Sequence, residues 1–188
     1  RLSFHWDGGA GTKATLGAAF TSHELGAQPL VLRNQADFYA RSVDEDEFTE
    51  IDQNQQFLKL EHETETGTIT SITSRNDWDM NPNKLDIDLS NLPFDSNNPL
   101  AKMISTISQD QQLWSQELRF NHTTDNELSW TIGGYLSEEK IDGLATRDIA
   151  ASAVLYTPPY FPFSVPTSYV LESENYAGFF IAEKTLTK

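Results

Sequence analysis

Two neighbouring stretches decide the fold class: Trp114-Ser-Gln-Glu-Leu-Arg-Phe-Asn121 and Leu128-Ser-Trp-Thr-Ile-Gly-Gly-Tyr-Leu136. In the first stretch, Leu118 and Phe120 alternate with polar residues, which is the pattern of a strand with one apolar face. Between the stretches lies Thr123-Thr-Asp-Asn126, which is made of residues that favour turns. Together they predict an antiparallel hairpin with its turn at residues 123–126.

The same pattern recurs along the chain. Leu2, Phe4 and Trp6 alternate with polar residues ahead of a glycine-rich turn at 8–11, and a β-branched stretch follows a turn at 65–67. We therefore expect an all-β fold of antiparallel up-and-down hairpins. The expected strands cover about residues 1–7, 12–21, 55–64, 68–79, 113–122, 127–138 and 173–184.

Three long stretches, 22–54, 80–111 and 139–172, lack this alternation and contain all eight prolines. Proline has no N–H to donate in a central strand, so we expect these stretches to be loops or sheet edges. Short turns would then alternate with loops of about 30 residues, and compact soluble domains seldom contain such loops. Short turns on one side, long loops on the other and strands of about 9–11 residues are typical of outer-membrane β-barrels.

The tryptophans favour the same interpretation. Trp6 and Trp130 lie near the expected short turns, whereas Trp78 and Trp114 lie near the expected long loops. Tryptophan has an apolar ring and a polar N–H, so it gathers at the two interfaces of a membrane barrel. The alternative is that these rings pack in a soluble core.

Composition excludes several classes of function. The net charge of −15 disfavours nucleic acid as a partner, because a phosphate backbone is bound by clustered lysine and arginine. The chain has no cysteine, which rules out disulfides and thiolate metal sites, and no apolar run as long as a membrane-spanning helix. The chain begins in what reads as mid-strand, and seven strands are an odd number for a barrel, so we expect a segment of a larger barrel.

Four stretches resemble the barrel of TonB-dependent outer-membrane receptors. They are the Gln116-Glu-Leu-Arg strand, the Trp130-Thr-Ile-Gly-Gly-Tyr return strand, the 68–78 stretch before them and Glu174-Asn-Tyr-Ala-Gly-Phe179 after them. They occur in the order found in that family, over roughly residues 55–188.

The resemblance implies a plugged barrel of about 22 strands in the outer membrane of a Gram-negative cell. It also implies import of a scarce nutrient, most often a ferric siderophore, sometimes cobalamin or a carbohydrate. Energy would come from the TonB complex acting through an N-terminal plug. No plug is recognisable within the 188 residues, so we expect these residues alone to transport nothing.

The expected ligand-facing residues lie in the stretch 139–172. Tyr156, Tyr160, Phe161 and Phe163 would line the external mouth of the barrel. We expect no enzyme activity, no cofactor and no metal site, because the four histidines have no metal-binding spacing and no nucleophile motif is present. The acidic run Asp44-Glu-Asp-Glu47 and the aspartates around Trp78 lack the spacing of a calcium loop, so we interpret them as solvated.

A second hypothesis remains open: a soluble all-β binding module, for example one that binds carbohydrate by stacking sugars on these aromatic rings. A β-rich enzyme of another kind is a more distant third. The module would bury one apolar face against a second layer and would have no apolar belt facing lipid.

Overall fold

The chain forms a single layer of β-structure in a computed structural model. Seven strands follow one another: β1 (Leu2–Gly9), β2 (Thr12–Gly26), β3 (Phe48–Thr64), β4 (Gly67–Asp86), β5 (Lys102–Thr123), β6 (Leu128–Val154) and β7 (Thr157–Lys184). The structure describes residues 1–26, 46–87, 102–123, 128–154 and 157–184, with backbone alone at 102, 123, 150–154 and 157–162.

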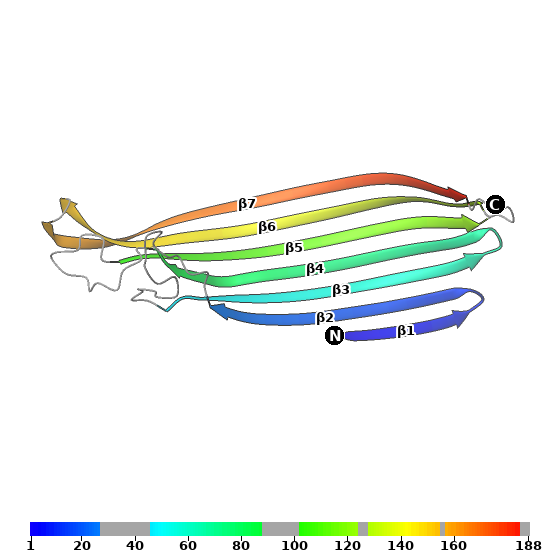
Figure 1. Ribbon diagram of the computed structural model, residues 1–188, viewed down its shortest axis with the longest axis horizontal. Coiled ribbons are helices and arrows are strands. Elements are labelled where there is room, and N and C mark those ends of the chain that lie inside the picture. The colour runs from blue at the N-terminus through cyan, green and yellow to red at the C-terminus, as the bar shows by residue number, and fades with distance from the viewer. Residues whose placement is uncertain (27–45, 88–101, 124–127, 155–156, 185–188) are drawn as a thin grey trace.

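The strands lie in sequence order in one open sheet, and every neighbouring pair is antiparallel. In the described part of the chain β1 forms one edge and β7 the other, as Figure 1 shows. The expected all-β class and the up-and-down hairpin order are therefore confirmed.

Two of the three expected short turns are confirmed. The β1–β2 turn places Gly9, Ala10 and Gly11 at positive φ, a backbone region that glycine tolerates best. The β3–β4 turn is closed by Thr64, whose hydroxyl accepts a hydrogen bond from the Gly67 N–H at 3.1 Å. The third turn, at residues 123–126, lies largely outside the described residues, although the strands on both sides of it are in place.

The expectation of a long loop over residues 139–172 is wrong. β6 continues to Val154 and β7 begins at Thr157, so this stretch is a long hairpin. The other two expected loops are shorter than predicted, because β2 runs to Gly26, β4 runs to Asp86, and β3 and β5 begin earlier than expected. From β2 to β7 the strands have 15 to 28 residues rather than about 9–11.

The prolines explain part of this error. Pro158, Pro159, Pro162 and Pro166 all lie in β7, which is an edge strand where a missing N–H breaks no second ladder. Pro82 lies in β4 where the register with β5 shifts between Met80 and Asn83. The prolines of β7 therefore fit the sheet-edge alternative of the sequence-based interpretation, whereas Pro82 lies in an inner strand, which that interpretation did not expect.

The register divides the side chains between two faces. Leu118 is opposite Gly134 and Phe120 opposite Ile132, whereas Arg119 is opposite Gly133. Because cross-strand partners share a face and neighbours along a strand do not, Leu118, Phe120, Trp130 and Ile132 lie on one face, and Glu117, Arg119 and Thr131 lie on the other. This confirms the predicted alternation. We call these the belt face and the ion-pair face.

The sheet has almost no core. Among the described residues, Ile104 is the one buried large hydrophobic side chain. The accessible surface is 13180 Å², whereas a compact protein of this mass exposes about 9,000 Å². The hydrogen-bonded ladder orders the strands, but little apolar surface is removed from water.

Candidate functional site

The belt face carries a broad apolar surface next to the short turns. We call it the apolar belt, and it consists of Leu2, Phe4, Trp6, Leu16, Leu58, Leu60, Ile69, Trp114, Leu118, Phe120, Trp130, Ile132, Leu136, Tyr176 and Phe180. These side chains come from all seven strands, and most are exposed; Leu118 is 55% and Phe180 65% accessible. Exposed apolar patches of this extent mark interaction surfaces.

Within the belt, two opposed glycines leave a hollow. Gly134 on β6 pairs with Gly178 on β7, and neither contributes a side chain. The hollow measures about 920 Å³ and is lined mainly by apolar residues, among them Leu118, Phe120 and Ile132. The belt is therefore apolar in this hollow as well as on the exposed side chains around it.

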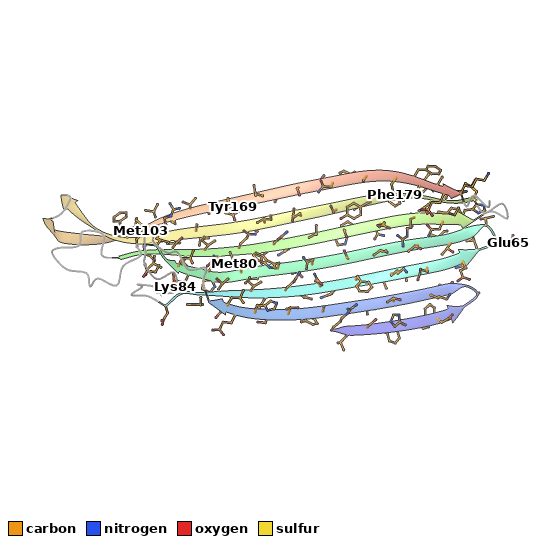
Figure 2. The ribbon with its side chains drawn as sticks, viewed as in Figure 1. Glu65, Met80, Lys84, Met103, Tyr169 and Phe179 are labelled. Carbon is orange, nitrogen blue, oxygen red and sulfur yellow. The ribbon has the colours of Figure 1, made fainter. Side chains whose placement is uncertain are left out.

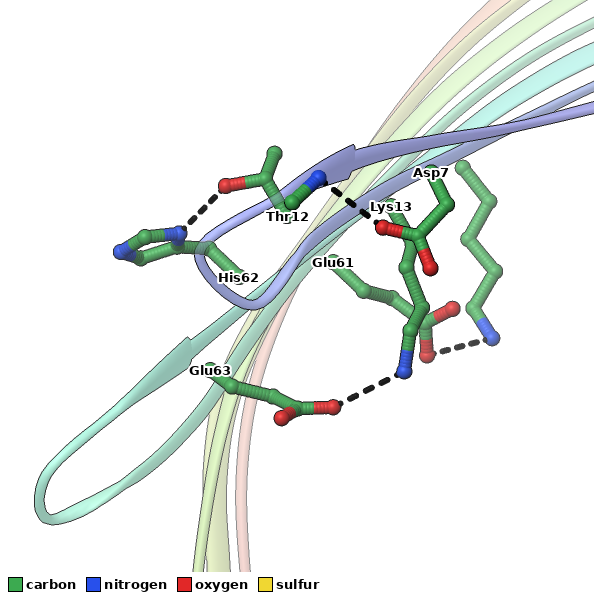
Figure 3. Close-up of polar contacts among 8 residues, drawn as sticks. Asp7, Thr12, Lys13, Glu61, His62 and Glu63 are labelled. Atoms are coloured by element: carbon green, nitrogen blue, oxygen red, sulfur yellow. Dashed lines mark hydrogen bonds and ion pairs between the residues drawn. The ribbon is translucent and has the colours of Figure 1, made fainter.

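At the same level, the ion-pair face is charged and paired. Lys13 lies 3.0 Å from Glu63, Lys59 lies 2.7 Å from Glu61, and Arg119 lies 3.2 Å from Glu117. Figure 3 shows the Lys13–Glu63 pair beside the short turns, together with the 2.8 Å hydrogen bond between His62 and the Thr12 hydroxyl, which lies on the belt face.

Uncharged hydrogen bonds continue this polar surface. Ser74 bonds to Ser115 across two strands at 2.7 Å, and Thr131 donates to Asn121 at 2.8 Å. The buried polar side chains Thr70, Ser105 and Ser137 also lie on this face. One face of the short-turn half is therefore apolar and the other polar.

Farther from the short turns, the belt face becomes acidic. Asp52, Asp79, Asp110 and Asp142 oppose one another across β3, β4, β5 and β6, and we call them the aspartate row. Lys140 lies 2.7 Å from Asp142. The hydrogen bond and charge of Asp142 raise the pKa of Lys140. Burial, together with the charges of Asp110 and Asp52, raises the pKa of Asp79.

On the ion-pair face at this level, two adjacent rows hold no acid, lysine or arginine from β3 to β7, and they continue on β2 with Thr21 and His23. The first row is Gln53, Trp78, Gln111, Ile141 and Leu171, and the second is Ile51, Met80, Gln109, Gly143 and Tyr169. We call these ten residues the neutral patch. Figure 2 labels Met80 and Tyr169, which belong to its second row. The polarity of the two faces therefore inverts along the strands.

Three aromatic rings of the ion-pair face lie over glycines of the neighbouring strand. The ring of Tyr169 occupies the space where Gly143 would carry a Cβ, 2.1 Å from that position. Phe57 covers Gly17 and Phe179 covers Gly133 in the same way. The Tyr169 hydroxyl continues across the sheet and donates to the Gln109 side-chain oxygen at 2.9 Å.

The predicted ligand-facing aromatics are only partly placed. Tyr156 lies outside the described residues, and Tyr160 and Phe161 are described by backbone alone, within β7. Phe163 lies in β7 opposite Ile149 and is 49% exposed. The predicted loop position of these residues is therefore corrected to a strand for the three that are described.

Sequence reasoning missed the aspartate row and the neutral patch. The clearest signal was Trp78 between Asp77 and Asp79, which already placed an aromatic ring and acids on opposite faces. The partners Asp52, Asp110 and Asp142 could be added only with the register of four strands.

The histidines do not gather. His5 bonds to Ser3 and Thr15, and His122 bonds to the Thr66 carbonyl. No group of three or more potential ligands is arranged to hold a metal ion among the described residues. Asp44 and Asp88, both parts of the acidic stretches considered above, lie outside the described residues.

No family model, curated protein or solved structure matches this chain. Among the described residues there is no helix with the length and hydropathy needed to span a membrane.

Proposed function

We propose that this chain is part of an outer-membrane β-barrel of the TonB-dependent receptor type, which imports a scarce nutrient, most often a ferric siderophore in that family. The observation that carries the proposal is the apolar belt: one exposed, largely apolar face backed, at the same level, by an ion-paired face. Lipid outside and an aqueous lumen inside require this pairing of faces.

The dimensions of the belt support the proposal. On β5 it runs from Trp114 to Phe120. The Trp114 row also holds the charged residues Arg75, Glu138 and Glu174 and forms the outer margin, whereas His122 and Trp130 are paired at the short-turn margin. These eight residue steps, from 114 to 122, cover about 27 Å along the strand. At a tilt of about 40° this becomes about 20 Å along the membrane normal, close to the apolar band of about 25 Å in such barrels. The aspartate row and the neutral patch would then lie outside the membrane-spanning part.

Aromatic residues mark both margins of the belt. His122, Trp130 and Phe120 lie together at the short-turn margin. The ring centroid of Trp130 is 5.3 Å from that of His122 and 5.5 Å from that of Phe120. Trp114 and Tyr176 lie toward the other margin. Such rings favour membrane interfaces. Trp6 and Trp78 do not fit this simple arrangement, since Trp6 lies within the belt and Trp78 lies on the ion-pair face.

The resemblance to the receptor family supplies the transport function. In that family ligand is taken from outside, and the TonB complex acts through a plug. The long ends of the strands, opposite the short turns, would project toward the outside. Their surfaces would meet the ligand first.

The test is whether Leu118 touches lipid. A fluorophore is attached to a cysteine at 118 or, in a second variant, at 119, and the protein is placed in vesicles whose acyl chains carry bromine. Quenching at 118 and little quenching at 119 is expected, because the two side chains lie on opposite faces. Equal quenching at both positions, or none at 118, would count against a membrane barrel and favour the soluble binding module.

A further inference from the structure

We infer that the neutral patch binds an uncharged ligand that combines an apolar or aromatic face with many hydrogen-bonding groups. This inference rests on the proposed function and narrows it, because it states which chemistry the outer part of the lumen accepts. Uncharged iron chelates and neutral oligosaccharides share this chemistry.

The composition of the patch is the first argument. Trp78 and Tyr169 provide ring surfaces, and Met80 provides a soft apolar side chain. Between them lie the amide side chains of Gln53, Gln109 and Gln111. Aromatic rings and amides together suit ligands that stack by one face and exchange hydrogen bonds by their edges.

The amides keep unused bonding capacity. Gln53 donates one hydrogen bond to Asn76 at 3.2 Å, Gln109 accepts one from Tyr169, and Gln111 donates one to the Glu139 carboxylate in the adjoining row. A primary amide can donate two hydrogen bonds and accept two. These contacts hold the side chains in place while leaving further donors and acceptors for a ligand.

Charge is the second argument. None of the ten residues of the neutral patch carries a charge at neutral pH, and the adjoining row toward the belt adds Glu139. On this face beyond the belt, Arg147 is the one cationic side chain in the described ranges. Anionic chelates are bound by clustered arginines, and the protein has a net charge of −15. The patch therefore disfavours an anion.

The contrast with the opposite face strengthens this argument. Between the two uncharged rows the belt face carries the aspartate row, and the next row includes Asp77 and Glu172. The acids of these strands are thus directed away from the neutral patch. The patch remains uncharged even though the surrounding strands are strongly acidic.

Three probes separate the possibilities by isothermal titration of the protein in detergent micelles: an uncharged ferric trihydroxamate, maltoheptaose, and a trianionic ferric tris-catecholate. We expect one of the two neutral probes to bind. Trp78→Ala should weaken that binding about tenfold, because an aromatic contact contributes about 1.4 kcal/mol at its upper range. The first probe would identify an iron chelate and the second a glycan. Trp114→Ala, the same change on the belt face, should leave affinity within about twofold.

The inference is overturned if the catecholate binds more tightly than both neutral probes, if no neutral probe binds at millimolar concentration, or if Trp78→Ala and Trp114→Ala weaken binding equally. The result of the lipid-quenching experiment at position 118 does not depend on whether any of these probes binds. Quenching at 118 with no binding of a neutral probe would reject the ligand inference alone, whereas absence of quenching would reject the membrane barrel itself.

Discussion

At the scale of single residues, glycines set how aromatic rings lie on the ion-pair face. Each covered glycine lacks the Cβ that would force the opposite ring away from the sheet. The ring therefore lies flat and covers backbone that would otherwise be bare. At Gly143 this arrangement also brings the Tyr169 hydroxyl to Gln109 on the second strand along.

Gly143→Ala should displace the Tyr169 ring, because the new methyl group would stand 2.1 Å from a ring carbon. We expect a loss of about 1 kcal/mol, the contribution of a neutral hydrogen bond. The measurement is urea unfolding in micelles of Gly143→Ala, Tyr169→Phe and the double variant. If the ring and hydroxyl act together, the double variant loses less than the sum of the single losses.

Gly134→Ala is the matched control, since the nearest atom to its Cβ position is 3.7 Å away. It should change stability by less than Gly143→Ala does. Equal losses in the two alanine variants would show that backbone freedom, and not the ring, decides the effect.

Asp79 should make stability depend on pH in an unusual direction. Its pKa is raised in the folded state by burial and by Asp110 and Asp52, so its ionised form is the less stable one. The loss of folding stability caused by ionised Asp79 is fully present above the folded pKa and disappears as pH falls toward the pKa of the unfolded chain, near the ordinary value of 3.8. Asp79→Asn should therefore stabilise the protein at pH 7 by about 0.5 kcal/mol, in the range for opposed like charges.

The same variant should give no stabilisation at acidic pH, where Asp79 is already protonated. Urea unfolding of the parent and of Asp79→Asn at both pH values makes the comparison. A stabilisation that persists unchanged at low pH would assign the effect to packing of the amide rather than to charge.

At the scale of elements, the alternation of apolar and polar residues changes phase along β5 and β6. On β6 the apolar residue Leu136 lies on the belt face, whereas Ile141, an odd number of positions away, lies on the ion-pair face. On β5 the same change separates Leu118 from Leu113. In the far half, apolar side chains such as Ile141 and Leu113 therefore lie on the ion-pair face, although Leu144 and Val170 remain on the belt face.

This change of phase explains how far the sequence could predict the fold. The hairpins around 8–11, 65–67 and 123–126 were predicted because the alternation keeps one phase there. Residues 139–172 looked irregular because the phase shifts after Leu136 and because β7 contains four prolines. Faces of single strands follow from sequence, whereas rows such as Asp52 with Asp110 depend on register, which no single-strand pattern specifies.

Substituting the belt face should test its environment strand by strand. Leu118→Arg, in the middle of the belt, is expected to destabilise the protein in a bilayer by about 2–4 kcal/mol, because arginine at mid-depth must reach water or lipid headgroups. Val170→Arg on β7 lies on the same face beyond the belt, opposite Asp142, and should cost much less. The measurement is reversible unfolding in lipid vesicles, and similar losses at both positions would contradict the proposed depth of the belt.

At the scale of the whole molecule, the sheet has two faces and no second layer in the described part of the chain. Its edges, β1 and β7, expose ladder groups that pair readily with other strands. In hydrocarbon each unpaired backbone group costs several kcal/mol, so a sheet of this kind in a membrane must gain neighbours at both edges. The proposed barrel provides them.

The 188 residues alone should therefore not remain monomeric in water without detergent. With Ile104 as the one large hydrophobic side chain buried in the described part, hydrophobic burial is too small to offset the entropy of ordering the strands. Light scattering coupled to gel filtration should show association or an expanded chain, and detergent should restore a β-rich circular-dichroism spectrum. The isolated residues should also transport nothing, since seven strands enclose no lumen. A compact monomer in plain buffer, resistant to protease, would require a covering layer for the apolar belt and would favour the soluble binding module over the barrel.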